Sequence, residues 1–201
     1  MAAKLAQLRD GNTGTRAFRL LVEELGTLLT YEASGDLARR AITVQTPLAV
    51  ATGQTIAMRI GLVPVLRAGT SMLQGALHLF PEAQVWHLGV YRDEHRLVPV
   101  EYYNRLPATP TVDVCFVLDP MLATGGSAVA TVDILRRWGV ADVRFVGVIG
   151  APEGIAAFFA AHPDVPVTLA AVDDSLNDRA YIIPGLGDAG DRQFGTGSSS
   201  V

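Results

Sequence analysis

Apolar residues near the N-terminus recur every three or four positions, which is the spacing of one helix face. The positions are Phe18, Leu21, Val22, Leu25, Leu28 and Leu29. This periodicity predicts an amphipathic helix over residues 15–31, with Thr13 or Thr15 available as its N-cap. The next segment, residues 41–57, is rich in β-branched residues and is broken by proline and glycine. We expect a hairpin-like excursion there that takes part in a homodimer or larger homo-oligomer.

From Ile60 onward the pattern changes to short apolar runs separated by helical patterns. The runs predict strands at residues 60–66, 85–90, 112–118, 143–149 and 167–172. The helical patterns cover residues 69–80, 127–138 and 153–161. Strands that are apolar on both faces and alternate with helices predict an α/β fold with a covered parallel sheet. Ligands bind beyond the carboxyl ends of such strands, so we expect the site in the loops after Leu66, Val90, Leu118 and Val172.

Composition supports a large core and argues against several classes of function. Hydrophobic residues make up 49% of the 201 residues and charged residues 18%, which excludes a disordered chain. The formal net charge of −4 argues against a nucleic-acid partner, because such proteins usually carry a basic excess. Cys115 is the single cysteine, so no intrachain disulfide can form. We interpret it as a buried strand residue.

Neither the N-terminus nor any apolar run has the features of a targeting or membrane segment. Residues 1–4 lack the apolar core of a signal peptide. The apolar runs are shorter than the roughly 18–20 residues that a membrane span needs. We therefore expect a cytoplasmic protein with no membrane partner.

The strongest chemical signal lies between the strand at residues 112–118 and the following helix. It reads Asp119-Pro120-Met121-Leu122-Ala123-Thr124-Gly125-Gly126-Ser127. Its last four residues can turn successive backbone N–H groups toward one point at a helix N-terminus, which makes a phosphate cradle. No lysine follows the glycines, so the stretch is not a Walker loop. Asp119 at the strand tip suits a sugar diol or a magnesium-bound oxygen, so together the two parts fit a ribose 5-phosphate.

This stretch resembles the 5-phosphoribosyl-1-diphosphate (PRPP) motif of phosphoribosyltransferases, in the wording used by uracil phosphoribosyltransferases. Further segments are similar to that family, in family order: TLLTYEA at 27–33, PVLRAG at 64–69, YR at 91–92, APEGI at 151–155 and YIIPGLGDAGD at 181–191. The resemblance implies a parallel-sheet, type I phosphoribosyltransferase-like fold with a C-terminal base-binding loop, or hood, and a hairpin-like excursion. It implies one domain over residues 1–201. Its parts would be an N-terminal helical region at 1–33, an α/β core at 60–172 and a uracil-binding segment at 173–195.

The implied reaction joins uracil to the ribose of PRPP and gives UMP and diphosphate in pyrimidine salvage. The resemblance assigns PRPP to Arg67, Arg92, Asp119, Pro120, Met121, Leu122, Ala123, Thr124, Gly125, Gly126, Ser127 and Asp188. It assigns uracil to Ile182, Gly187, Asp188 and Ala189. The implied catalytic residues are Asp119, Arg67 and Asp188, and the role of Asp188 as general base or orienting group stays open. Mg²⁺ is expected to enter as Mg–PRPP, with no dedicated protein ligands, and GTP is an expected effector with no residues mapped.

Residues 185–190 also fit the pattern G-x-G-x-x-G. A dinucleotide site requires a preceding strand, a following helix and a complete βαβ unit. Only eleven residues follow Gly190, and their pattern is not helical. We therefore reject a dinucleotide-dependent oxidoreductase and expect a glycine-rich loop that approaches the edge of a flat base.

Residues 93–107 predict a polar loop, with Tyr102 and Tyr103, that folds over the reacting centre and excludes water. The residues His95-Arg96, Val98 and Arg105 depart from the family wording, which places loop closure in question. Two alternative functions stay open. One is a phosphoribosyltransferase for another base, which differs in residues 181–191. The other is an RNA-binding regulator that senses uridine nucleotides on the same fold.

Overall fold

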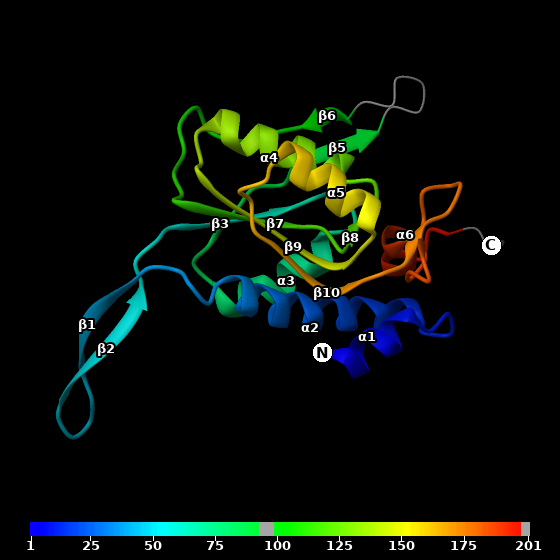
Figure 1. Cartoon of the computed structure of the whole chain (residues 1–201). Helices are drawn as coiled ribbons and strands as arrows, with labels where there is room; N and C mark the ends of the chain where they lie inside the picture. The colour runs from blue at the N-terminus through cyan, green and yellow to red at the C-terminus, as the bar shows by residue number, and fades with distance from the viewer. Residues whose placement is uncertain (93–98, 198–201) are drawn as a thin grey trace.

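The computed structural model describes residues 1–92 and 99–197, with side chains described for residues 1–89 and 103–197. Its centre is a parallel sheet with strand order β10-β9-β7-β3-β4 (Figure 1). The strands are β3 (Ile60–Pro64), β4 (Gln84–Val85), β7 (Val114–Leu118), β9 (Asp142–Gly150) and β10 (Val167–Val172). A short strand, β8 (Met121–Leu122), continues from the end of β7 and also pairs with β9. The predicted α/β fold with a parallel sheet is confirmed.

Helices cover both faces of this sheet because its strands are apolar on both sides. One face carries α1 (Ala2–Arg9), α2 (Thr15–Ala33) and α3 (Thr70–Leu79), and the other carries α4 (Gly126–Trp138) and α5 (Pro152–Ala161). Consecutive strand residues alternate between the two layers, since Phe116 belongs to the core under α2 and Val117 to the core under α4.

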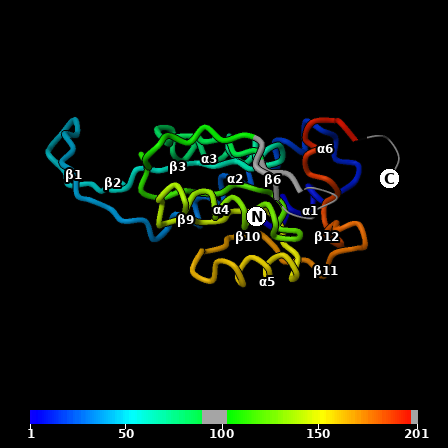
Figure 2. Tube along the Cα trace, turned by 90° about the horizontal axis from the view of Figure 1, so that it is seen from above, coloured from blue at the N-terminus to red at the C-terminus, as the bar shows by residue number. Residues whose placement is uncertain are grey.

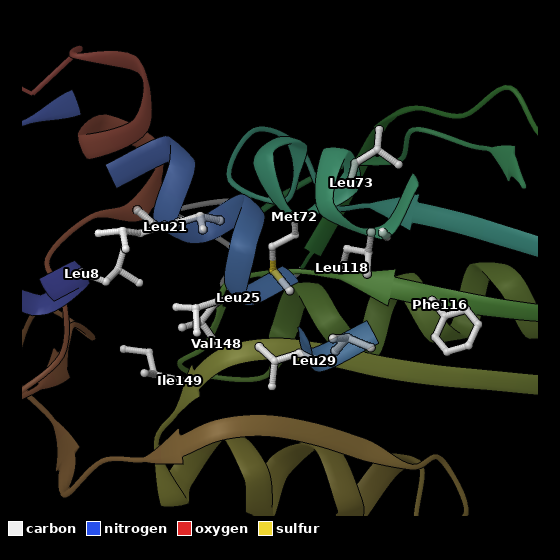
Figure 3. Close-up of a cluster of buried hydrophobic side chains, with 14 of the residues drawn as sticks. Leu8, Leu21, Leu25, Leu29, Met72, Leu73, Phe116, Leu118, Val148 and Ile149 are labelled. Atoms are coloured by element: carbon white, nitrogen blue, oxygen red, sulfur yellow. The ribbon is translucent and has the colours of Figure 1, made fainter. Parts of the chain in front are cut away.

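The core under α2 is built from large aliphatic side chains that interlock with α3 and the sheet. Figure 3 shows Leu25, Leu29 and Met72 close together there, with Phe116 farther along the sheet; each is at most 1% exposed. Full burial of such side chains stabilises a fold by about 1.5–3 kcal/mol each. Helices α2 and α3 can approach this closely because Gly75 has no side chain. A Cβ there would lie only 2.1 Å from the Glu23 carbonyl oxygen.

The first predicted helix is confirmed, but its predicted cap is wrong. Helix α2 begins at Thr15 and its N-cap is Gly14, with no side-chain cap bond. The Thr13 hydroxyl instead donates to the Gln7 carbonyl, 2.6 Å away. This contact belongs to the turn between α1 and α2, and the sequence pattern did not predict α1.

The predicted excursion at residues 41–57 is an antiparallel hairpin of β1 (Arg39–Gln45) and β2 (Val50–Ile56). Its turn is closed by Thr46: the Thr46 amide donates to the Ala49 carbonyl at 2.9 Å, and the Ala49 amide donates to the Thr46 hydroxyl oxygen at 3.0 Å. The hairpin extends away from the sheet at the end of the molecule opposite α6 (Figure 1, Figure 2).

The predicted strand at residues 85–90 is divided in the structure. Only β4 joins the main sheet, whereas β5 (Gly89–Arg92) pairs antiparallel with β6 (Pro99–Tyr103). Between β4 and β5, Leu88 forms an isolated parallel bridge with Val65, the residue after β3. The apolar run is therefore shared between the edge of the sheet and a separate ribbon. The predicted lid residues His95-Arg96 and Val98 lie outside the described part of the chain.

The C-terminal segment contains three short elements that the sequence pattern did not predict. They are β11 (Ser175–Leu176), β12 (Ile182–Ile183) and α6 (Ala189–Phe194). The expectation of no helix after Gly190 was wrong, because Asp188 caps a short helix by accepting a bond from the Asp191 amide at 2.8 Å. None of the helices in the described residues is long and apolar enough to cross a membrane.

Candidate functional site

The turn after β3 lies directly against the end of β7. The Val65 amide donates to the Leu118 carbonyl at 3.0 Å. A Cβ on Gly69 would lie only 2.1 Å from the same carbonyl oxygen, so a glycine is required for this approach. Parallel pairing of β3 and β7 thus places Arg67 and Asp119 at one edge of the sheet, as the loop rule predicted.

Asp119 carries a carboxyl group whose environment favours the protonated form. The side chain is half-buried, and the Met121 amide donates to its Oδ1 atom at 3.3 Å. Burial raises the pKa of Asp119 to about 7, against the smaller opposing effect of the Met121 bond. A carboxyl group of this kind gains from a cationic or hydroxyl-bearing ligand that stabilises its ionised form.

The predicted phosphate cradle begins α4 with free main-chain donors. Gly125 is the N-cap, with φ of +81°, and no side chain in the described part of the chain caps the helix. The first N–H groups of such a helix lack intrahelical partners and carry partial positive charge. They can therefore receive an anion.

Gly154, in the first turn of α5, supports this loop from behind. A Cβ on Gly154 would lie 2.1 Å from the Ala123 carbonyl oxygen, and one on Gly125 would lie 2.8 Å from the Gly154 carbonyl oxygen. The two loops therefore pack backbone against backbone. Gly154 lies in the family-like segment at residues 151–155, but the sequence alone does not indicate a role for it. The available signal was a glycine inside a helix, where it is disfavoured without a packing reason.

Residues 188–196 reach back to the Arg67 turn. Arg67 Nη2 lies 3.3 Å from Asp191 Oδ1, and its Nη1 donates to the Thr196 hydroxyl at 3.3 Å. The Gln193 side chain donates to the Ala68 carbonyl at 2.9 Å. Asp191, Gln193 and Thr196 were missed from the sequence because their partners lie more than 120 positions away in the chain.

The other predicted residues divide into three groups. Gly187 and Asp188 precede α6 and Ala189 begins it; a Cβ on the next residue, Gly190, would be 3.6 Å from Arg67 Nη2. The side chains of Leu122 and Ile182 are at most 5% exposed and belong to the core. Arg92 ends β5, and its side chain lies outside the described ones.

Within the described residues, no group of three or more His, Cys, Asp or Glu side chains is arranged to hold a metal ion. Carboxylate oxygens of the type that Asp119 provides are the ligands that Mg²⁺ prefers. The donor set at this edge of the sheet therefore fits a magnesium ion that a substrate's own oxygens also coordinate.

Comparison with known families gives a match over almost the whole chain. The model of the family described as uracil phosphoribosyltransferase matches residues 1–196. The uracil phosphoribosyltransferase of Roseiflexus castenholzii is 59% identical over 194 residues, which cover 96% of this chain and 93% of the relative. That of Geobacillus kaustophilus is 50% identical with the same coverage.

Solved structures resemble the fold at two levels. The AQ2163 protein from Aquifex aeolicus superposes with a TM-score of 0.89 at 37% identity, over 96% of this chain and 93% of that chain. A hypoxanthine phosphoribosyltransferase from Staphylococcus aureus has a TM-score of 0.53 at 9% identity, over 82% and 83%. The second likeness shows a shared fold alone.

Proposed function

The chain belongs to the uracil phosphoribosyltransferase family, and on this premise we propose how its residues divide the work of the reaction. The enzyme converts uracil and PRPP to UMP and diphosphate, the reaction of pyrimidine salvage. The observation that carries the residue assignment is the meeting of the Arg67 turn, the Asp119 strand end and residues 188–191 at one edge of the sheet.

In this proposal the 5-phosphate of PRPP binds residues 124–127. The uncapped N-terminus of α4 and the left-handed Gly125 support the assignment. An anion at such a helix end is stabilised by roughly 0.3–1 kcal/mol when exposed and up to about 2 kcal/mol when partly buried. Pro120 and Leu122 shape the loop rather than bind the ligand with their side chains, because their carbonyl groups accept amides of β9 and of Ala151.

Asp119 is assigned to the ribose hydroxyls of PRPP. Ligand hydroxyl groups that donate to its carboxylate favour ionisation, which burial alone opposes. Mg²⁺ bound by PRPP would neutralise charge on the diphosphate and so assist its departure. Asp119 then orients the sugar so that its C1 atom faces the base.

Arg67 and Arg92 are assigned to the diphosphate. The Arg67 side chain is 57% exposed and its ion pair with Asp191 is 3.3 Å long. An exposed pair of this kind contributes about 0–1 kcal/mol, so the guanidinium can exchange Asp191 for diphosphate oxygens at little cost. A planar guanidinium binds such oxygens in bidentate fashion.

Uracil is assigned to the backbone around Ile182, Gly187, Asp188 and Ala189. Main-chain amides and carbonyls match the acceptor and donor edge of uracil, and a mismatched base leaves buried groups unpaired. Asp188 already accepts the Asp191 amide with one oxygen, which favours an orienting role over proton removal. Attack of uracil N1 on C1 as diphosphate leaves needs no covalent enzyme intermediate, so positioning and electrostatics supply most of the acceleration.

We also propose that the β1–β2 hairpin contributes to a homodimer or larger homo-oligomer. Leu48 at its turn is 96% exposed and Val50 is 67% exposed. Apolar side chains that project on an extended hairpin are typical of subunit contacts.

A response to GTP is a further property that the family resemblance implies, and turnover with and without GTP tests it.

The test of the proposed function is turnover of PRPP and Mg²⁺ with each base in turn. We expect UMP from uracil and no nucleotide from cytosine, adenine or hypoxanthine. Formation of a purine nucleotide in place of UMP would favour the alternative of another base. Salt-sensitive binding of RNA without turnover would favour the regulator.

A further inference from the structure

Arg9 and Asp173 together hold both polar backbone groups of Gly185. Asp173 Oδ2 accepts the Gly185 amide at 2.9 Å, and Arg9 Nη1 donates to the Gly185 carbonyl at 2.8 Å. The two side chains also pair with each other through two contacts, one of 2.7 Å between Nη1 and Oδ2 and a second between Nη2 and Oδ1. The four groups close a ring around one residue of the loop.

This ion pair is buried where it meets the loop. The Asp173 side chain is 3% exposed and that of Arg9 is 23% exposed. The Arg9 bond, followed by the weaker effect of the Gly185 amide, lowers the pKa of Asp173 against the effect of burial. Buried ion pairs are often no more stabilising than apolar residues of similar size. Stability alone therefore gives little reason for a charged pair at this place, whereas fixing the geometry of the loop does.

A second arginine, Arg192, binds the carbonyl of the next residue in the loop. Arg192 Nη1 donates to the Leu186 carbonyl and to the Leu8 carbonyl, each at 2.8 Å. Its guanidinium carbon also lies 4.3 Å from the centre of the Phe18 ring. Helix α1 and the turn after it are thus attached to Gly185 and Leu186 by side chains from both segments, and both views show α1 beside the C-terminal elements (Figure 1, Figure 2).

The backbone held in this way leads directly into the residues assigned to the base. Gly185 and Gly187 both have positive φ, +64° and +76°, and a Cβ on Gly185 would lie 2.0 Å from the Ile182 carbonyl oxygen. A loop with two such glycines can adopt many conformations in the unfolded chain. Contacts from other segments must therefore fix its conformation in the folded protein. A base read by backbone groups requires those groups to be fixed before it arrives.

We propose that Arg9 and Asp173 are positioning residues for uracil, which set the backbone of residues 185–189 through their shared hold on Gly185. The inference rests on the proposed assignment of uracil to that segment. It gives the N-terminal helix α1 a part in base recognition, although Arg9 lies 176 positions before Gly185. Neither residue contacts a reacting atom in this account.

The test compares three variants: Arg9→Met, Asp173→Leu and the double variant, because an asparagine at 173 would still offer an oxygen to the Gly185 amide. Each single change leaves one buried partner uncompensated, so it lowers the melting temperature and raises the KM for uracil. The double variant removes both charges and regains much of the melting temperature. We expect its KM for uracil to stay about tenfold or more above that of the unsubstituted enzyme, with the KM for PRPP within about twofold, because Gly185 is still released.

The matched control is Arg144→Met. Arg144 is likewise buried, pairs with Asp36 and Asp142, and donates to the Ala33 carbonyl at 2.8 Å. This variant should lower the melting temperature and leave the two KM values unchanged.

Recovery of the KM for uracil together with stability in the double variant would overturn the inference, as would equal rises in both KM values. UMP formation with an unchanged KM for uracil in all three variants overturns this inference alone. Absence of UMP formation by the unsubstituted chain overturns the proposed function and this inference together.

Discussion

Arg67 and Asp191 form an ion pair, with 3.3 Å between Nη2 and Oδ1, that joins the turn after β3 to α6. The pair links a residue assigned to diphosphate with the segment assigned to the base. Its two side chains are 57% and 38% exposed, so the link is weak and exchangeable. Under the proposed assignment, we expect diphosphate binding at Arg67 to release Asp191 and so to affect the position of α6.

Replacement of Arg67 tests the diphosphate assignment. Arg67→Ala should lower kcat/KM for PRPP by about 10²–10³, because charge that develops on the leaving group loses a donor. Arg67→Lys should recover a small part of this loss, since a point charge does not bind two oxygens in a plane. Steady-state kinetics with PRPP as the varied substrate measure both. Near-normal turnover of Arg67→Ala would contradict the assignment.

Asp191→Asn tests how much the ion pair with Arg67 contributes to the stability of the fold. We expect the free energy of unfolding to change by less than about 1 kcal/mol, because the pair is exposed on both sides. Urea denaturation gives this value. A loss well above 2 kcal/mol would mean that Asp191 holds the C-terminal segment in place by more than this pair and its bond from Thr196.

The raised pKa of Asp119 makes stability dependent on pH. The folded pKa of about 7 exceeds the ordinary value of 3.8, so the folded state binds a proton more tightly than the unfolded state. Stability from this group is complete below pH 4 and is lost as the pH rises to 7, by up to about 4 kcal/mol. Asp119→Asn should therefore be more stable than the unsubstituted enzyme at pH 8, with little difference at pH 4. It should also be inactive, because Asp119 is assigned to the ribose hydroxyls.

Thermal unfolding of the two proteins across this pH range measures the effect. The gap in melting temperature should widen between pH 4 and pH 7 and then stay constant. A gap that does not depend on pH would show that the pKa of Asp119 is not raised in the free enzyme.

Gly154→Ala should disturb the phosphate cradle from behind. The new methyl group would lie 2.1 Å from the Ala123 carbonyl oxygen, so residues 123–125 must move. We expect the KM for PRPP to rise by tenfold or more and stability to fall by about 1–3 kcal/mol. Gly35→Ala is the control, because its methyl group would meet its nearest neighbour at 3.5 Å. Unchanged kinetics in Gly154→Ala would argue against a rigid cradle.

Paired polar substitutions at Leu48 and Val50 test the hairpin as a subunit contact. Both side chains are exposed in the single chain, at 96% and 67%, so Leu48→Ser with Val50→Ser should not destabilise it. We expect a shift toward monomer in light scattering coupled to size-exclusion chromatography. An unchanged oligomer, or a protein that is monomeric before substitution, would remove the hairpin from this role.

The central sheet was predictable because its strands carry continuous apolar runs with clear ends. The hairpin and the loop at residues 119–127 were predictable because each has a local signal, β-branched residues broken by proline and glycine in the first and a glycine-rich turn before a helix in the second. The run at residues 85–90 misled because periodicity does not show which sheet a strand joins, and here Val85 and Val90 belong to different sheets.

The arrangement of the candidate site was predictable where its residues are contiguous in sequence and not where it depends on distant pairing. Asp119 and residues 124–127 form one stretch of sequence. Arg9, Asp173 and Asp191 gain their roles from partners far away in the chain. Helix α6 has six residues and depends on the Asp188 cap, so it has too few apolar positions to reveal a period.

The central claim is that the turn between β7 and α4 binds the 5-phosphate of PRPP. A crystal structure of the enzyme with PRPP and Mg²⁺ tests it most directly. We expect the 5-phosphate oxygens within hydrogen-bond distance of the main-chain amides of residues 124–127, with the ribose hydroxyls at Asp119. A phosphate bound elsewhere, with that turn free of ligand, would contradict it.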